Sequence, residues 1–297
     1  MPNTFPEIRN DKIDVAVGIS SQSILLSCIW VSVWFGSGVA ITILLKQLSA
    51  PQFGFEFMST LTMIHFLCQW LFVRGVFMCT DRFGEYQRAK PEHWRSIVCV
   101  GVCTGLDIVL TNLTFGFLSL GCQTVLKNLA PLAIYVMSCL CGVEKWRASI
   151  VLVILVICLS CVLTVSDVRG SFIGVIMLIF SVFCTACRWV IVQTLHGNYK
   201  SMNQMALAQP FAAISLVPYV MIFEAPYWSS AAPLPFMGYV YAGGTVACSI
   251  VLVLSSYQIT AYTSATTLAV LGNARGAFII FFGAFMLGES EEYSIFG

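Results

Sequence analysis

The stretch LSLGCQTVLKNLAPLAIYVMSCLCGVE, residues 118–144, decides how this chain folds. It is long and apolar enough to cross a bilayer as a helix, which takes about 20 residues, yet it carries the cation Lys127. Shifted by 145 positions, it lies without a gap over TSATTLAVLGNARGAFIIFFGAFMLGE, residues 263–289, which carries Arg275. This match predicts two related membrane-spanning halves. The identical pairs are Ser119/Ser264, Val125/Val270, Leu126/Leu271, Asn128/Asn273, Ile134/Ile279 and Glu144/Glu289.

The composition of the whole chain agrees with a membrane protein. Of 297 residues, 58% are hydrophobic and 10% are charged, and the mean hydropathy is +0.87. A soluble domain has about 25% charged residues, so a soluble globular protein and a disordered chain are both excluded. The net charge of +1 gives no sign of a nucleic-acid partner.

Nine apolar runs are long enough to span the hydrocarbon core. Because lipid offers no hydrogen-bond partner to an open backbone, each run is predicted to be a helix, and the fold class is all-α integral membrane. The runs are Ile24–Leu45, Phe57–Met78, Ser96–Phe115, Ser119–Gly142, Ala148–Val165, Phe172–Leu195, Met205–Phe223, Met237–Tyr257 and Thr266–Leu287.

The matching fourth and ninth spans lie five helices apart and therefore run in opposite directions. This is typical of transporters built from two inverted-topology repeats. We expect a cytosolic tail over residues 1–22, a first repeat of five helices over 23–167 and a second repeat over 168–297. A tenth helix would complete the second repeat, and we expect it to be missing from this chain. A true nine-span protein is the alternative.

Lysine and arginine set the orientation of such a protein, because they concentrate on the cytosolic side. Numbering the connections alternately puts nine of these residues on the side of the N-terminus and two on the other side, so the N-terminus is predicted to be cytosolic. The first 20 residues are polar and mixed in charge, which predicts neither a cleavable signal nor a transit peptide. The first side holds Arg9, Lys12, Arg82, Arg88, Lys90, Arg95, Lys145, Arg147 and Lys200, and the second holds Lys46 and Arg169.

Three cations lie inside predicted spans, namely Lys127, Arg188 and Arg275, against the one comparably deep acid Asp107. Each cation costs roughly 2.5–3.5 kcal/mol at a helix centre. Such an excess of buried positive charge predicts an anion that arrives and leaves. In a purely structural alternative, Asp107 pairs with one cation and Arg188 extends to the cytosolic face.

Lys127 and Arg275 are predicted to face each other near the midplane, since they lie at similar depths in antiparallel helices. Pro131 cannot donate a hydrogen bond to the carbonyl of Lys127, and Gly272 and Gly276 bracket Arg275. Such interruptions in corresponding places indicate a binding site. Close helix packing through small residues is the alternative for the two glycines.

Polar side chains near these cations could orient a ligand, although each alone more often makes an interhelical hydrogen bond. Because the planar guanidinium matches phosphate, the expected ligand is a phosphate or diphosphate. We expect substrate contacts from Lys127, Arg275, Arg188, Asn128, Thr124, Asn273 and Tyr135. Gln193 and Ser264 also lie near the cations.

Other patterns do not predict chemistry. The 13 cysteines lie in or beside spans and suit packing better than a metal site. His65 suits a helix–helix hydrogen bond, with a proton relay as the alternative. Gly101 and Gly105 indicate packing. No catalytic motif, metal site, cofactor site or nucleotide-binding domain is recognisable, so we do not expect an enzyme.

Three segments together resemble one family. They are LSLGCQTVLKNLAPLAIYVMSCLCGVEKWRA (118–148), FSVFCTACRWVIVQ (180–193) and YTSATTLAVLGNARGAFIIFFGAFMLGE (262–289). They resemble the triose-phosphate and nucleotide-sugar transporter family of the drug/metabolite transporter superfamily, whose animal members form solute-carrier family 35. The resemblance implies ten helices in two inverted repeats and the exchange of one organophosphate for another anion.

The resemblance also assigns individual residues. Lys127 stands at the fourth-helix lysine of the family's phosphate site, and Arg188 at its sixth-helix arginine. Arg275 stands where relatives carry lysine, and Gly276 replaces the second member of the Lys-Arg pair of plastid sugar-phosphate carriers.

The expected function is an antiporter that exchanges a phosphorylated sugar or nucleotide sugar for phosphate or a nucleoside monophosphate, in a Golgi or endoplasmic reticulum membrane. Two alternatives stay open, an exporter of uncharged metabolites in the same superfamily and a non-transporting membrane regulator. The sequence also leaves a homodimer open.

Overall fold

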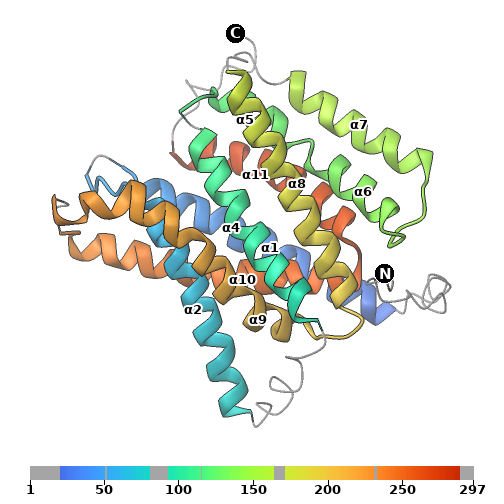
Figure 1. Cartoon of the computed structure of the whole chain (residues 1–297), viewed down its shortest axis with the longest axis horizontal. Coiled ribbons are helices and arrows are strands. Elements are labelled where there is room, and N and C mark those ends of the chain that lie inside the picture. The colour runs from blue at the N-terminus through green and yellow to red at the C-terminus, as the bar shows by residue number, and fades with distance from the viewer. Residues whose placement is uncertain are drawn as a thin grey trace.

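A computed structural model describes residues 21–50, 52–80, 93–114, 116–163, 171–230 and 233–287. Within these ranges the chain forms helices joined by turns and no β-sheet, which confirms the all-α prediction (Figure 1). Most of the expected N-terminal tail, Glu289 of the sequence repeat, and the cations Arg9, Lys12, Arg82, Arg88, Lys90 and Arg169 lie outside the described residues. The helices are α1 (Ser21–Leu48), α2 (Met58–Cys79), α4 (Trp94–Thr114), α5 (Leu120–Lys127), α6 (Ala130–Leu140), α7 (Ala148–Leu163), α8 (Phe172–Leu195), α9 (Ser201–Tyr219), the π-turn η3 (Val220–Glu224), the 3₁₀ turn η4 (Ala225–Ser230), α10 (Phe236–Tyr262) and α11 (Ala265–Leu287).

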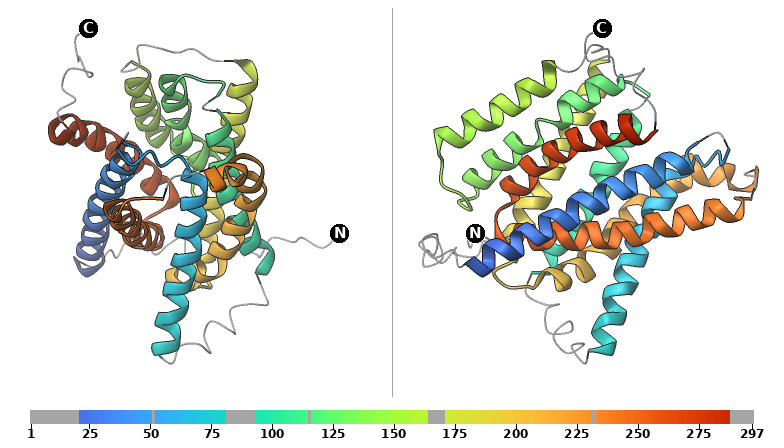
Figure 2. Two further views of the ribbon diagram at one scale, coloured as in Figure 1. Left: turned by 90° about the vertical axis from the view of Figure 1, so that its left-hand side faces the viewer. Right: turned by 180° about the vertical axis from the view of Figure 1, so that it is seen from behind.

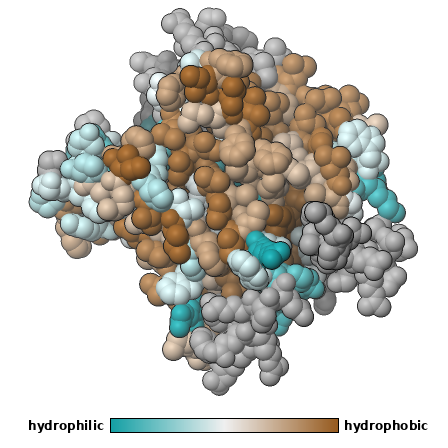
Figure 3. Space-filling model, viewed as in Figure 1, coloured by the Kyte–Doolittle hydropathy of each residue, from teal (hydrophilic) through white to brown (hydrophobic). Residues whose placement is uncertain are grey.

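Six of the described helices are long and apolar enough to cross a membrane. The other three predicted runs contain α7, α11 and the pair α5 and α6. Apolar side chains cover much of the surface in Figure 3, and exposed Leu, Ile and Phe residues run along α7 and α8. A soluble protein rarely exposes so continuous an apolar surface, so the chain is a multi-pass membrane protein whose apolar belt faces lipid. The spans are Ile24–Leu48, Met58–Cys79, Trp94–Thr114, Phe172–Leu195, Ser201–Ser229 and Phe236–Tyr262.

Helices far apart in the sequence pack side by side. α1 packs along α10, α4 packs against α8, and α9 packs between α2 and α4 (Figures 1 and 2). α6 contacts both α8 and α11, and α7 lies beside α6 at the edge of the bundle. The first and second parts of the chain therefore interleave and do not form separate lobes.

Small residues let α4 and α9 approach closely. A Cβ added at Gly101 would lie 2.7 Å from the carbonyl oxygen of Ala208 and would also clash with Phe211. A Cβ at Gly105 would clash with Ser215. The packing role predicted for these two glycines is confirmed. Gly272 and Gly276 have no heavy atom within 4 Å of an added Cβ among the described residues, so the packing alternative does not hold for them there.

Gly101→Ala is expected to lower the free energy of unfolding by about 2 kcal/mol, because the new methyl overpacks against a backbone carbonyl that cannot move away. Thermal unfolding of the detergent-purified protein measures this. Gly75→Ala on α2 is the matched control, since its Cβ meets nothing within 4 Å. Equal stability of the two variants would contradict a tight α4–α9 contact.

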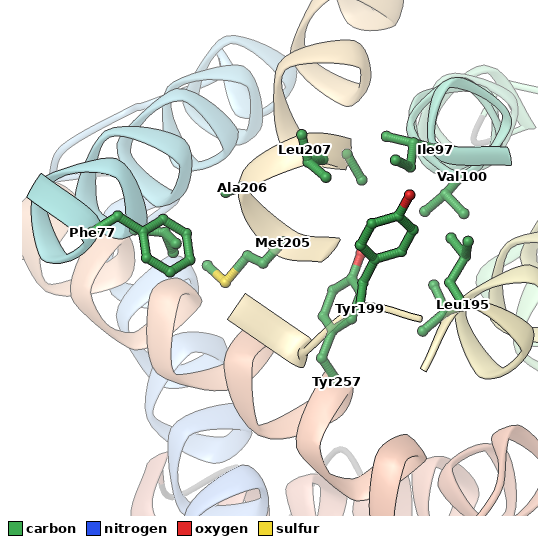
Figure 4. Close-up of a cluster of buried hydrophobic side chains, with 12 residues drawn as sticks. Phe77, Ile97, Val100, Leu195, Tyr199, Met205, Ala206, Leu207 and Tyr257 are labelled. Atoms are coloured by element: carbon green, nitrogen blue, oxygen red, sulfur yellow. The ribbon is translucent and has the colours of Figure 1, made fainter. Parts of the chain in front are cut away.

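One apolar cluster ties together the ends of five helices (Figure 4). It joins α2, α4, α8, α9 and α10 through side chains that include Phe77, Val100, Leu195, Met205 and Tyr257. Met205 is completely buried. Because all these ends lie where α8 turns into α9, the cluster closes the bundle at that end.

At the opposite end, Glu224 joins the end of α9 to the start of α2. Its carboxylate accepts the backbone N–H groups of Ser59 at 2.8 Å and Thr60 at 2.7 Å. The first N–H groups of a helix lack partners within the helix, and the helix dipole favours an anion there. The contact thus holds the two helices together without burying an unpaired charge.

The fourth predicted span is a broken helix. α5 ends at Lys127 and α6 begins at Ala130, with Pro131 in its first turn. The Pro131 ring has no N–H for the Lys127 carbonyl, so the interruption lies where the sequence predicted a helix breaker. The break makes α5 and α6 two short helices of 8 and 11 residues.

Candidate functional site

A cavity of about 420 Å³ lies in the middle of the helix bundle. It is lined from α1, α2, α4, α6, α8, α9, α10 and α11. The volume falls within the range of about 300–1,000 Å³ that is usual for small-molecule sites. Of the residues predicted to bind substrate, Arg188, Asn273 and Arg275 line this cavity.

Arg275 extends from α11 across the face of α1. Its guanidinium carbon lies 4.0 Å from the ring centroid of Trp34, and its Nε and Nη1 are shielded from solvent with no hydrogen-bond partner among the described residues. The Trp34 indole N–H donates to Ser256 at 2.8 Å, which fixes the ring beneath the cation. The Arg275 guanidinium is therefore stabilised by the face of the Trp34 ring, and its Nε and Nη1 donors are available to a ligand.

Gly38 gives the Arg275 side chain its space. A Cβ at this position would lie 2.7 Å from Arg275 Cδ and 2.9 Å from Nη1. Trp34 and Gly38 are four residues apart and share one face of α1, so the ring and the gap together form a seat for the guanidinium.

Gly38→Ala is expected to raise the Kd for phosphate, the ligand predicted from the sequence, about tenfold, because the methyl displaces Arg275 and weakens a charge-assisted contact. The fold should survive, since the clash is with a flexible side chain. Gly36→Ala is the control, because no described atom lies within 4 Å of its Cβ. Binding of labelled phosphate to the purified protein measures both, and an unchanged Kd in Gly38→Ala would remove Arg275 from the site.

Arg188 is the second cation of the cavity. Its guanidinium carbon lies 4.9 Å from the ring centroid of Trp189, and its Nε is shielded and makes no hydrogen bond to a described residue. Thr185, one turn earlier on α8, also lines the cavity with a shielded, unpartnered hydroxyl. Two guanidiniums with free donors thus line one cavity.

Lys127 has a different environment. Its ammonium donates to Asp107 at 2.6 Å and to Ser181 at 2.7 Å, and the Ser181 hydroxyl donates to the same Asp107 oxygen. The Asp107 side chain is 13% exposed and the Lys127 side chain 31% exposed. The ion pair that the structural alternative required is present and takes Lys127 as its cation, so the excess positive charge of the cavity comes from the two arginines.

The remaining predicted residues lie around the break in the fourth span. The Asn273 amide donates to the Asn128 carbonyl at 3.3 Å, so the two asparagines matched by the sequence repeat contact each other. Thr124 is exposed. The Tyr135 hydroxyl accepts the Arg147 backbone N–H at 2.7 Å and thereby fixes the turn between α6 and α7. Thr124, Asn128, Tyr135 and Lys127 are not among the residues that line the cavity.

Several cavity residues were missed by sequence reasoning. Trp34 lines the cavity beneath Arg275, with Gly38 beside it on α1, and Gln69 on α2 and Gln209 on α9 add two buried carboxamides. A glutamine inside an apolar run is a signal that could have found the last two, because polar residues inside membranes mark pathways or contacts.

Comparison with known proteins adds relatives over most of the chain. No model of a known protein family matches the sequence. A probable sugar phosphate/phosphate translocator of Arabidopsis thaliana is 24% identical over 270 residues, which cover 88% of this chain and 76% of the relative. A GDP-mannose transporter of the same plant is 22% identical, covering 84% and 74%, and its UDP-galactose transporter 1 is 22% identical, covering 82% and 74%.

The resemblance predicted from the three motif segments is confirmed by these matches. The relatives are named as transporters and not as enzymes. Over most of its length the chain is thus related to plant sugar phosphate/phosphate translocators and nucleotide-sugar transporters, consistent with the triose-phosphate and nucleotide-sugar transporter family.

Proposed function

We propose that this protein is a transmembrane antiporter that exchanges a phosphorylated sugar or nucleotide sugar for phosphate or a nucleoside monophosphate. The observation that carries the proposal is the pair Arg188 and Arg275, two guanidiniums that line one cavity without a hydrogen-bond acceptor among the described residues. A buried cation without a partner is costly, and a mobile phosphate supplies charge and acceptors together. The names of the relatives support the same substrate class.

We propose that Arg188, Arg275 and Asn273 form the phosphate end of the site. Lys127 does not contact the phosphate directly, because Asp107 already compensates its charge. It reaches substrate only if that ion pair opens. The Asn128 carbonyl joins the broken helix to Asn273, and the Tyr135 hydroxyl fixes the turn after α6.

We further propose that the nine spans are arranged as inverted repeats over residues 23–167 and 168–297. Exchanging each helix for the one five spans later turns the α1–α10 contact into the α8–α4 contact and leaves the α2–α9 and α6–α11 contacts unchanged. This pattern supports a pseudo-two-fold axis, and the broken fourth span is typical of midplane sites in transporters.

The unpaired arginines also suggest how exchange is coupled. Closing an empty cavity encloses two cations in a low dielectric, whereas a bound phosphate neutralises them. The empty carrier therefore crosses slowly, and each crossing must also break contacts between the halves such as Glu224 with the start of α2. Equal efflux with and without an anion on the far side would contradict obligatory exchange.

Counterflow into proteoliposomes tests the function. Vesicles preloaded with phosphate or a nucleoside monophosphate are offered labelled sugar phosphates, GDP-mannose and UDP-galactose. Uptake that requires the internal anion supports the proposal. Uptake of uncharged metabolites alone would indicate an exporter of neutral solutes, and no uptake by verified folded protein would indicate a regulator.

We place the protein in the Golgi membrane, with the endoplasmic reticulum second, and its N-terminus in the cytosol. Successive described helices cross the membrane in alternate directions. Counted in this way, Arg95, Lys145 and Lys200 all lie at helix ends on the same side of the membrane as the start of α1, which supports the orientation. Protease protection of an N-terminal tag in sealed Golgi vesicles tests it.

A further inference from the structure

The cavity has a second polar wall, which carries no formal charge. It is formed by α2 and α9, the pair that packs together across the two parts of the chain. Gln69 and His65 line it from α2, and Gln209 lines it from α9. All three side chains are buried, with Gln69 only 1% exposed.

The three side chains differ in whether they already have a hydrogen-bond partner. His65 on α2 has one on α10, since its Nε2 lies 3.0 Å from the Thr245 hydroxyl. The Gln69 carbonyl oxygen is shielded from solvent and has no partner among the described residues. Gln209 lines the cavity from α9 and is 4% exposed. The cavity wall therefore carries two buried carboxamides, and that of Gln69 has an acceptor oxygen without a partner among the described residues.

Unused polar groups gather at this one cavity. The cavity lining includes five polar atoms that are shielded and have no hydrogen-bond partner among the described residues, namely Gln69 Oε1, Thr185 Oγ1, Arg188 Nε and two nitrogens of Arg275. Buried polar groups are normally hydrogen-bonded, so their concentration around a cavity indicates a polar guest. The guest must offer acceptors to the arginines and both donors and acceptors to the glutamines.

A sugar attached to a phosphate meets both requirements. A carboxamide has one acceptor and two donors, which match hydroxyl groups that donate and accept. A carboxamide carries no charge, so the phosphate binds better to the arginines than to the glutamines. The cavity of about 420 Å³ also exceeds what inorganic phosphate alone needs.

We propose that Gln69 and Gln209 form the sugar-recognising subsite of the carrier, which binds the hydroxyls of a sugar whose phosphate rests on Arg188 and Arg275. The inference rests on the proposed function and adds to it the residues that distinguish a sugar-bearing substrate from its sugar-free counterpart. Because Gln69 and Gln209 come from helices of opposite halves, the bound sugar bridges the two halves. The phosphate binds to the arginines next to this subsite.

Steady-state uptake by the reconstituted full chain tests this subsite. The probes are labelled GDP-mannose, UDP-galactose and glucose 6-phosphate, each against its counterpart lacking the hexose, namely GDP, UDP and phosphate. Gln69→Leu and Gln209→Leu should each raise the KM for the hexose-bearing member about tenfold, the effect of a lost hydrogen bond that leaves a polar partner unpaired. The KM for the counterpart should change less than twofold.

The control is Gln123→Leu. Gln123 is also buried, and its amide nitrogen has no partner among the residues described, yet it does not line the cavity. It should leave both KM values unchanged, while Arg275→Gln should impair both substrates. Deoxy analogues of the hexose add a second test, since the penalty for removing the recognised hydroxyl should vanish in the glutamine variant.

The outcomes separate the two proposals. Exchange by the wild type with equal effects of Gln69→Leu and Gln209→Leu on both members of a pair, or with none, overturns the sugar subsite and leaves the antiporter intact. No exchange of any organophosphate by folded wild type overturns both. Where a leucine variant does not fold, the methionine variant at the same position takes its place.

Discussion

Arg275→Gln should reduce anion exchange about a hundredfold and at the same time make the empty protein more stable. The loss follows because a charged partner of the phosphate disappears from a desolvated site, a change that costs about 2–5 kcal/mol of binding. The stability gain follows because two shielded nitrogens of Arg275 have no hydrogen-bond partner in the part of the chain that the structure describes. Removing unpaired buried donors returns about 1–3 kcal/mol.

Proteoliposome uptake and thermal unfolding of the same preparation measure the two effects. Arg74→Gln is the matched control, since Arg74 lies 5.4 Å from the Trp70 ring on α2 but outside the cavity. Arg275→Lys should retain part of the activity because it keeps the charge and loses the planar fork. Loss of activity together with loss of stability would instead give Arg275 a structural role.

Asp107→Asn is expected to destabilise the protein by about 3 kcal/mol, since it leaves the Lys127 ammonium without the charge that compensates it. Asp107 accepts from Lys127 and Ser181 through one carboxylate oxygen, so the substitution disturbs both contacts. The loss should appear as a lower unfolding temperature and a lower yield of monodisperse protein in detergent.

The double variant Asp107→Asn with Lys127→Met should recover most of this stability, because no charge is then left unpaired. Its transport activity decides what Lys127 does. Activity near that of the wild type would make the ion pair a structural element between α4, α5 and α8. Lost exchange in a stable double variant would instead place Lys127 among the groups that bind the anion.

The sequence was sufficient for those features that depend on local chemistry. Apolar runs must become helices in lipid, so α1, α2, α4, α8 and α10 were predictable within a few residues. Pro131 predicted the break after Lys127, because a missing N–H acts within one turn. The spacing of Gly101 and Gly105 predicted close packing, since small residues four apart form a flat helix face.

The sequence could not predict which side chains contact each other across different helices. Three cations competed for Asp107, and only the packing of both α4 and α5 against α8 selects Lys127. Tyr135 lies close to Lys127 in the sequence, but its hydroxyl accepts the backbone N–H of Arg147, just before the start of α7. The seat of Arg275 joins α1 with α11, residues more than two hundred positions apart, and no local pattern carries that contact.

The unpartnered groups of the cavity have a consequence for how much of the protein a cell holds. Any ligand that binds the folded state alone raises its stability as its concentration exceeds Kd. A carrier that stands empty opens more often to the quality-control proteases that remove unfolded chains. We therefore expect its half-life to lengthen when its anion is plentiful and to shorten when the anion is scarce, so that abundance follows supply without any dedicated sensor.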